Sequence, residues 1–344
     1  MGIVTAVAAG VEEFSEAVIA MDPAAGRAVV DRMLAEGTDP IVVIDQVIVP
    51  SQRLVGLRWQ QAELTVAQQH AATEVAMAAA EVLGRHLAQL PRRHGHVLLA
   101  CAEREWHALP ITLVGLAIRA AGWETTMLGA GVSPLRLSRY LHELGPDATA
   151  ISCSVLASLP TSRRFIEASS AAGVPTVVGG AAFGPDARRA DALGATAWAS
   201  SARGAVHALQ GLPLVVPPVP SLPRELVTEL AGLRELHPSM LVDLGARWRP
   251  FGSQQIEPRL PDSTAEVVRD CIDQALHAVA AALLTDDPAV LADTRSWIAA
   301  VLLARGDRLA DEHAGELGIL LTTMLREFPR AEAVLGSAWE PAGP

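Results

Sequence analysis

Two residues in the stretch AEREWHALPITL, Glu105 and His107, have side chains whose types and spacing could do chemistry. His107 follows a short apolar run and precedes a segment with helical periodicity, so we expect it in a loop after a strand. A carboxylate two residues before a histidine can accept a hydrogen bond from one ring nitrogen and leave the other free to bind a metal. The alternative is a loop histidine that only hydrogen-bonds to a nearby backbone group.

Small residues end two later apolar runs. Ser152 and Ser154 follow the run in ATAISCSV, and Gly179 and Gly180 end the run in PTVVGG. Small residues at such positions allow a large flat ligand to approach the backbone. We therefore expect these residues and His107 to meet at one edge of a sheet, where α/β domains bind ligands.

The elements that must position these residues follow from a change in periodicity. From residue 93 to 212, five short apolar runs (HVLLACA, ETTMLG, ATAISCSV, PTVVGG and ATAWAS) each precede a helical pattern. This alternation predicts a doubly wound, five-stranded parallel sheet. Residues 1–92 show helical spacing with breaks at Asp22-Pro23, Gly37 to Pro40 and Pro50, which predicts a four-helix bundle.

The remaining chain divides at a proline-rich stretch. Residues 213–223, PLVVPPVPSLP, are too poor in backbone donors for a helix or sheet interior and are interpreted as a linker. Residues 224–335 return to helical periodicity and predict a third, all-helical domain. The predicted fold class is therefore multidomain, α and α/β.

Composition excludes several functions. The 344-residue chain carries a formal net charge of −11 and no cluster of Lys and Arg, which argues against a nucleic-acid surface. Its first residues lack the basic region of a signal peptide and include acidic residues, so we expect a cytoplasmic protein without a membrane span. Cys101, Cys153 and Cys271 lie far apart without a CxxC pair and predict buried thiols rather than disulfides or a zinc site.

The strand-end residues resemble the motifs of the cobalamin-binding domain family: D-x-H-x-x-G at Glu105 to Pro110, S-x-L at Ser154 to Leu156, and G-G at Gly179-Gly180. The resemblance implies that His107 is the lower cobalt ligand, in place of the cofactor's own dimethylbenzimidazole, and that Glu105 orients it. The displaced tail would run into the sheet. Glu105 stands where the family has Asp, and Pro110 stands where it has Gly. Proline fixes the backbone angle φ at this position, so we expect the tail to take a slightly different path.

The bundle carries a second resemblance. Trp59, Gln69 and His70 are similar to the W-x9-E-H motif of light-sensing cobalamin regulators, in which tryptophan and glutamate enclose an adenosyl group. Gln69 stands at the position of the glutamate and can still hydrogen-bond to ribose hydroxyls. The resemblance implies adenosylcobalamin as cofactor. The alternative is that Trp59 closes the bundle core and His70 lies on a solvated face.

The third domain combines arginine with aromatic residues. Arginine pairs with carboxylates and tryptophan stacks on conjugated systems, which suits an elongated pigment with acid groups. Surface ion pairs around a tryptophan-filled core are the alternative. The order of domains resembles the photocobilins, which implies a globin-like domain that binds biliverdin, with Cys271 a disfavoured covalent anchor. The residues that motivate this interpretation are His237, Arg247, Trp248, Arg249, Trp297 and Arg305, and those expected to contact biliverdin are His237, Arg247, Trp248 and Arg249.

Three functions are compatible with these observations. The first is a homodimeric light sensor, not an enzyme, with adenosylcobalamin and biliverdin as chromophores. The second is a corrinoid carrier protein for methyl transfer, in which His107 tunes the cobalt. The third is an interaction module that binds no corrinoid. Trp59 with Gln69 and His70, and the additional helical domain, favour the sensor over the carrier.

Overall fold

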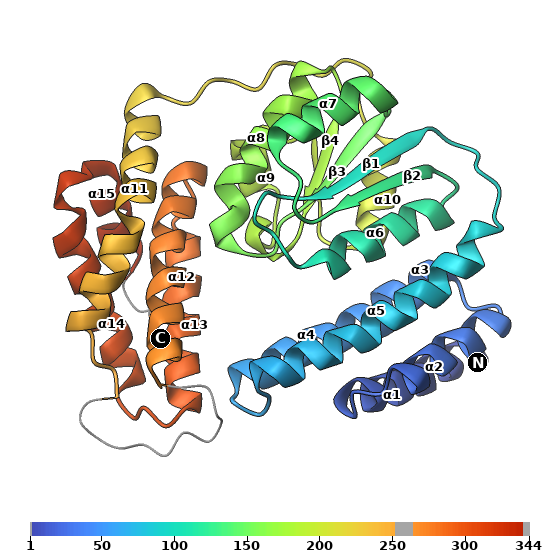
Figure 1. The fold of residues 1–344 in the computed structure, drawn as a ribbon, viewed down its shortest axis with the longest axis horizontal. Coiled ribbons are helices and arrows are strands. Elements are labelled where there is room, and N and C mark those ends of the chain that lie inside the picture. Colours follow the sequence, from blue (N-terminus) through green and yellow to red (C-terminus); the bar gives the residue numbers. More distant parts are fainter. Residues whose placement is uncertain (1, 252–263, 340–344) are drawn as a thin grey trace. The chain divides into compact units, whose positions relative to one another are not determined.

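The computed structural model describes residues 2–251 and 264–339 (Figure 1). The chain forms two compact units. The first unit comprises residues 1–57 and 66–219, and the second comprises residues 58–65 and 220–344.

The first unit begins with the predicted helical bundle. Asp22 starts the second helix, because its carboxylate accepts hydrogen bonds from the N–H groups of Ala24 and Ala25 and Pro23 occupies the first turn. Buried apolar residues such as Phe14 and Val30 fill the bundle core. The helical segments are α1 (Gly2–Ile19), α2 (Pro23–Ala35), α3 (Pro40–Val42), the π-helical η1 (Val43–Ile48), α4 (Val49–Gln60) and α5 (Val66–Ala88).

The helix break predicted at Pro50 is wrong, because α3, η1 and α4 form one continuous run from residue 40 to 60. The π-helical turn precedes the proline, and the N–H of Val49 bonds to the carbonyl of Ile44, five residues back. A proline lacks the N–H that an α-helical ladder needs, and a local π turn accommodates this loss without ending the helix.

The run Pro40–Gln60 is also, by length and composition alone, long and apolar enough to cross a membrane. Its Val43, Ile44 and Val47 are fully buried in the first unit. Its Asp45 accepts hydrogen bonds from two backbone N–H groups of the same unit. These residues of the run therefore pack within the first unit.

A five-stranded parallel sheet follows the bundle, as predicted, in the order β2-β1-β3-β4-β5. The register pairs Cys101 with Ser152, Ser152 with Gly179, and Gly179 with Ala199. The carboxyl ends of four strands are therefore level, and the loops that follow them meet at one edge. The strands are β1 (His96–Cys101), β2 (Glu124–Gly129), β3 (Ala148–Ser152), β4 (Thr176–Gly179) and β5 (Ala197–Ala199).

Helices cover both faces of this sheet (Figure 1). One face carries α6 (Ala108–Ala120) and α10 (Ala202–Gln210), which pack on each other. α5 of the bundle packs on α6. The other face carries α7 (Pro134–Leu144) and α8 (Leu159–Ala171), which also pack together, and the short α9 (Arg188–Ala192) precedes β5. Two 3-10 turns, η2 (Leu156–Ser158) and η3 (Ala181–Phe183), follow β3 and β4.

The predicted linker, residues 213–223, contains no helix or strand. Its first part is nevertheless held on the sheet domain, since the hydroxyl of Ser170 donates to the carbonyl of Pro217 at 2.9 Å. Residues up to Val219 belong to the first unit.

Every regular element described in the second unit is a helix, as predicted, and the last of them ends at Ala338. Pro238 lies inside its first helix. A globin-like arrangement of these helices stays a prediction. They are α11 (Arg224–Arg247), α12 (Thr264–Thr285), α13 (Ala289–Ala304), α14 (Ala310–Met324), the 3-10 turn η4 (Leu325–Glu327) and α15 (Pro329–Ala338).

Candidate functional site

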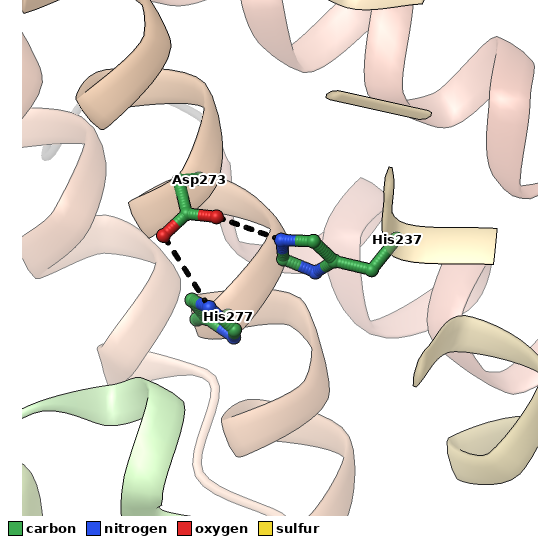
Figure 2. Close-up of side chains that lie close together, drawn as sticks. All are labelled: His237, Asp273 and His277. Atoms are coloured by element: carbon green, nitrogen blue, oxygen red, sulfur yellow. Dashed lines mark hydrogen bonds and ion pairs between the residues drawn. The ribbon is translucent and has the colours of Figure 1, made fainter. Parts of the chain in front are cut away.

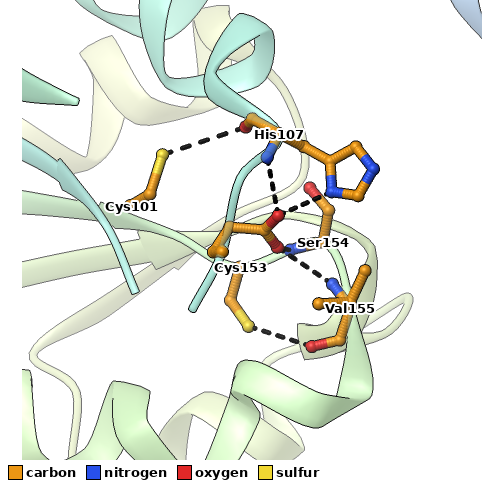
Figure 3. Close-up of polar contacts among 6 residues, drawn as sticks. Cys101, His107, Cys153, Ser154 and Val155 are labelled. Carbon is orange, nitrogen blue, oxygen red and sulfur yellow. Dashed lines mark hydrogen bonds and ion pairs between the residues drawn. The ribbon is translucent and has the colours of Figure 1, made fainter. Parts of the chain in front are cut away.

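Glu105 is the centre of the loop edge. Its side chain is fully buried, and its two oxygens accept four hydrogen bonds (Figure 3). Oε1 accepts the backbone N–H of His107 at 2.9 Å and its Nδ1 at 2.6 Å. Oε2 accepts the N–H groups of Ser154 at 2.6 Å and Val155 at 3.1 Å. One carboxylate therefore ties the loop after β1 to the loop after β3.

These contacts fix the state of the His107 ring. Because the carboxylate can only accept, Nδ1 carries the proton and Nε2 keeps its lone pair in the neutral ring. The side chain of His107 is 61% exposed, and Figure 3 shows its second nitrogen turned away from Glu105. The hydrogen bond expected from the sequence is present, and it leaves one nitrogen available to an external metal.

The pKa values of the pair follow from the same geometry. Burial by itself would raise the pKa of Glu105, but hydrogen bonds from the ring and backbone of His107 and from Ser154 outweigh it, so the pKa is lowered. The hydrogen bond to Glu105 raises the pKa of His107, against the opposing effect of burial. The site thus holds a stable negative charge directly behind the imidazole.

The loop that carries the pair is locally strained. Arg104 has a φ of +70°, which is uncommon for a residue with a Cβ. The turn is closed by the N–H of Glu105, which donates to the carbonyl of Ala102 at 3.0 Å. His107 occupies the N-cap position of α6 without capping it, because its ring is used on Glu105. The backbone is therefore shaped to present the ring.

A cavity of about 280 Å³ lies in the first unit at the same edge. Ser152, Gly179 and Gly180 line it, so the structure brings these three predicted residues together beside α6 and α10. Pro110 also lines it, at the position where the motif has glycine. Further lining residues are Ile111, Val114, Ile151, Val178, Ser200 and Ser201.

Gly179 and Gly180 line the cavity, and the conformation and packing of the backbone also require glycine at both positions. Gly180 has a φ of +106°, and a Cβ there would lie 2.3 Å from the carbonyl oxygen of Cys153. A Cβ on Gly179 would lie 2.6 Å from the carbonyl oxygen of Ala199. Both positions therefore require glycine for the strands and loops to pack, in addition to any ligand.

Sequence reasoning missed the contribution of the helix from residue 40 to 60. Asp45, Val49 and Arg53 line the cavity. The carboxylate of Asp45 accepts the N–H groups of Ala202 at 3.3 Å and Arg203 at 3.2 Å, which caps α10. A single aspartate within an apolar helical run was the available signal, but its partner lies 157 residues away.

One further predicted site residue, Leu156, and one residue that was not predicted, Trp106, also lie close to the edge. Leu156 is buried at the start of η2, directly after the N–H groups that Glu105 holds. Trp106, which the sequence reasoning passed over, is 74% exposed beside His107. Its ring lies near the loop that contains Gly131.

The predicted upper-face residues lie in different units. Gln69 is half-buried and His70 is exposed, both on α5 of the first unit. Trp59 belongs to the second unit, where its ring stacks on Trp297 with centroids 6.2 Å apart and lies under the guanidinium of Arg305. Trp59 therefore does not fill the bundle core, and its two neighbours Trp297 and Arg305 come from the helical domain.

The structure also separates the residues predicted to bind a pigment. Trp248 is fully buried and its Nε1 donates to the carbonyl of His313 at 2.9 Å, as the tryptophan-core alternative predicts. Trp248 and Arg249 line a cavity of about 650 Å³ between α11 and α12, whereas His237 and the exposed Arg247 are not among its lining residues. His237 instead contacts Asp273.

The three cysteines are free and buried, as expected. Burial raises the pKa of Cys101 and of Cys271 to about 12. A buried, protonated thiol is a poor nucleophile, so Cys271 is unsuited to a covalent pigment bond.

Comparison with known proteins agrees with this geometry. Residues 95–210 match a family described as B12 binding domain, and residues 11–83 match a second family of the same description. The HTH-type transcriptional repressor CarH of Myxococcus xanthus is 35% identical over 158 residues, 45% of this chain. The match spans 52%, about half, of that relative.

Corrinoid proteins are also similar to this chain. Trimethylamine corrinoid protein 2 of Methanosarcina acetivorans is 27% identical over 52% of this chain and 84% of its own length. The monomethylamine corrinoid protein of Methanosarcina barkeri shares the fold, with a TM-score of 0.50 and 21% identity over 57% of this chain and 95% of its own. The fold and the family matches together show that residues 11–83 and 95–210 form a cobalamin-binding module.

Proposed function

We propose that this chain is a light sensor that binds adenosylcobalamin with His107 as the lower cobalt ligand. The observation that carries the proposal is the Glu105–His107 pair: a buried carboxylate holds the Nδ1 proton, and Nε2 faces outward with its lone pair. An imidazole oriented by a carboxylate is the arrangement that metal-binding histidines use.

The chain's own residues fit the rest of the cofactor. The cavity lined by Ser152, Gly179 and Gly180 offers apolar walls and hydroxyl groups for the displaced nucleotide tail. Pro110 narrows the conformational freedom of this wall but leaves the cavity in place. A departure from the family motif is therefore compatible with the tail entering the sheet domain.

When bound, adenosylcobalamin supplies a cobalt–carbon bond that light can break. Glu105 keeps the His107 ring in one tautomer and orientation throughout. Trp59 lies in the last turn of α4, and its contacts with Trp297 and Arg305 join this turn to α13 and the residue that follows it. A displacement of Trp59 would therefore reach the helices of the second unit, which we propose as the output.

In this proposal the protein is a cytoplasmic signalling homodimer that acts without nucleic acid and is not an enzyme. Biliverdin is proposed as a second chromophore in the cavity of about 650 Å³, where Arg249 and Arg269 could pair with its propionates. Trp248 would contact the pigment only through the edge of its ring that lines this cavity.

A corrinoid carrier for methyl transfer is the second candidate. It is favoured by the similarity to the trimethylamine corrinoid protein, which spans most of that protein's length. In a carrier, the same Glu105–His107 pair would tune the cobalt, and the second unit would have no necessary part in the chemistry.

One experiment separates the candidates. The purified protein is mixed with adenosylcobalamin, and with methylcobalamin or biliverdin in parallel samples, and absorption spectra and gel-filtration profiles are recorded in darkness and after illumination. A sensor should show a spectral change together with a light-dependent change in elution volume. A carrier should bind methylcobalamin and adenosylcobalamin equally and keep one elution volume. If the cofactor mixed with the protein kept the spectrum of free cofactor, both candidates would be contradicted.

A further inference from the structure

A cluster of two histidines and one aspartate joins α11 to α12 in the second unit. His237 Nε2 lies 2.8 Å from Asp273 Oδ1, and His277 Nε2 lies 3.4 Å from Asp273 Oδ2. The two imidazole rings stack with centroids 4.4 Å apart. Figure 2 shows both rings turning a nitrogen toward the carboxylate.

The spacing of these residues follows from helix geometry. Asp273 and His277 are four residues apart on α12, so they share one face. His237 on α11 faces them from the neighbouring helix, and the three ligand atoms lie within 4.8 Å of one another. In a tetrahedral zinc site with bonds of ~2.1 Å, ligand atoms are separated by about 3.4 Å. Small side-chain rotations are therefore enough to bring the three atoms to one ion.

The chemistry of the donors suits a transition metal. Imidazole nitrogen and carboxylate oxygen are common ligands of Zn²⁺ and similar ions. Hydrogen bonds from His237 and His277 hold the pKa of Asp273 well below its usual range, so its carboxylate is charged at neutral pH. The side chains of His237, Asp273 and His277 are 20%, 43% and 25% exposed, which allows an ion to enter from solvent.

We propose that His237, Asp273 and His277 form a binding site for a divalent transition-metal ion, with Zn²⁺ as the expected occupant. Three protein ligands leave a fourth position for water or for an external group. The site is independent of the cobalamin module. Among the residues that the structure describes, these three form the one group of at least three His, Cys, Asp or Glu side chains whose ligand atoms lie close enough together to share an ion.

The position of the cluster suggests what an ion would do. Pro238 directly follows His237 and removes one hydrogen bond from the interior of α11. An ion held by both helices would link this weakened turn to α12. Binding should therefore raise the thermal stability of the protein.

The alternative is a purely hydrogen-bonded cluster, and titration of the full-length, cobalamin-free protein with ZnCl2 distinguishes the two. After removal of metals with EDTA and dialysis, calorimetry should show one equivalent of Zn²⁺ bound with micromolar affinity or tighter. His277→Ala and Asp273→Asn should lose that equivalent. His142→Ala, on the exposed surface of α7, and His107→Ala should keep it.

Two further measurements keep the test decisive. Far-UV circular dichroism without metal checks that the Asp273→Asn protein is folded, and Co²⁺ added to cobalamin-free wild type should give the visible absorption of a four- or five-coordinate ion. No binding by wild type up to 100-fold excess, or equal binding by all five proteins, would overturn the proposal. Loss of binding only in His107→Ala would assign the ion to the cobalamin edge instead.

Discussion

Trp59 stacks on Trp297, with ring centroids 6.2 Å apart and an angle of 22° between the planes. Trp59 lies at the end of α4, and Trp297 lies in α13. Although Trp59 comes from the amino-terminal third of the chain, this contact places it in the second unit. The indole N–H of Trp59 is buried without a hydrogen-bond partner among the described residues. The same side chain is therefore both a packing residue and a candidate contact for a ligand.

Substitution of Trp59 should reveal which of these roles is the larger. We expect Trp59→Ala to weaken adenosylcobalamin binding while hydroxocobalamin binds about as before, because only the adenosyl form has a large upper group. Spectroscopic titration with both cofactors measures the contrast. Trp297→Ala is the matched variant, because it removes the stacked partner, worth about 0.5–1.5 kcal/mol beyond burial, but leaves Trp59 in place. Equal weakening of both cofactors by Trp59→Ala would limit this residue to packing.

Replacement of His107 by alanine should weaken cobalamin binding at least about tenfold, since loss even of a ligand's supporting partner costs ~10–100-fold in metal affinity. The bound cofactor should then show the absorption spectrum of the form that keeps its own dimethylbenzimidazole on cobalt. Titration followed at visible wavelengths measures both effects. His142→Ala serves as the control at an exposed histidine. An unchanged affinity together with an unchanged spectrum would exclude His107 as the cobalt ligand.

Glu105→Gln should destabilise the cobalamin-free protein by ~1–3 kcal/mol, because one amide oxygen cannot accept all four hydrogen bonds and the new amide N–H groups face other donors. The loss should depend on pH. Glu105 has a lowered folded pKa, so its stabilisation is present above its ordinary pKa of 4.5 and is lost as the pH falls below that value. His107 has a raised folded pKa, so its stabilisation is complete below 6.5 and is lost as the pH rises above that value.

The difference in unfolding free energy between wild type and Glu105→Gln should therefore be largest between about pH 4.5 and 6.5. Urea unfolding at pH 4, 5.5 and 8 measures it. Glu143→Gln is the matched control, since Glu143 pairs with Arg139 on an exposed helix face and its loss should cost less than about 1 kcal/mol. A difference that is the same at all three pH values would show that Glu105 and His107 do not interact in solution.

Gly180→Ala should destabilise the sheet domain by more than about 1 kcal/mol, since alanine is disfavoured at positive φ and the added Cβ collides with a carbonyl. That Cβ would lie 2.3 Å from the oxygen of Cys153, so the loop after β3 must move. Cobalamin affinity should fall with it. Gly336→Ala on α15, where nothing lies within 4 Å, is the control and should stabilise by ~0.5–1 kcal/mol. Thermal unfolding of both variants with and without cofactor provides the comparison.

Much of the site could be predicted from sequence because its determinants are local. Glu105 and His107 are two residues apart, and their position after an apolar run placed them at the carboxyl edge of a strand. The alternation of strand and helix patterns similarly predicted the parallel sheet, because each buried strand and each amphipathic helix has its own periodicity. Level strand ends then brought Ser152 and Gly179 to the same edge.

The tertiary structure decided the features that depend on residues far apart in the chain. Asp45 caps α10 across 157 residues. Trp59 meets Trp297, and His237 meets Asp273 and His277 rather than the residues grouped with it by sequence. Pro50 continues a helix because a π turn precedes it. No local pattern encodes these contacts, since which helix faces pack together depends on the burial of the whole apolar surface and not on the spacing within one segment.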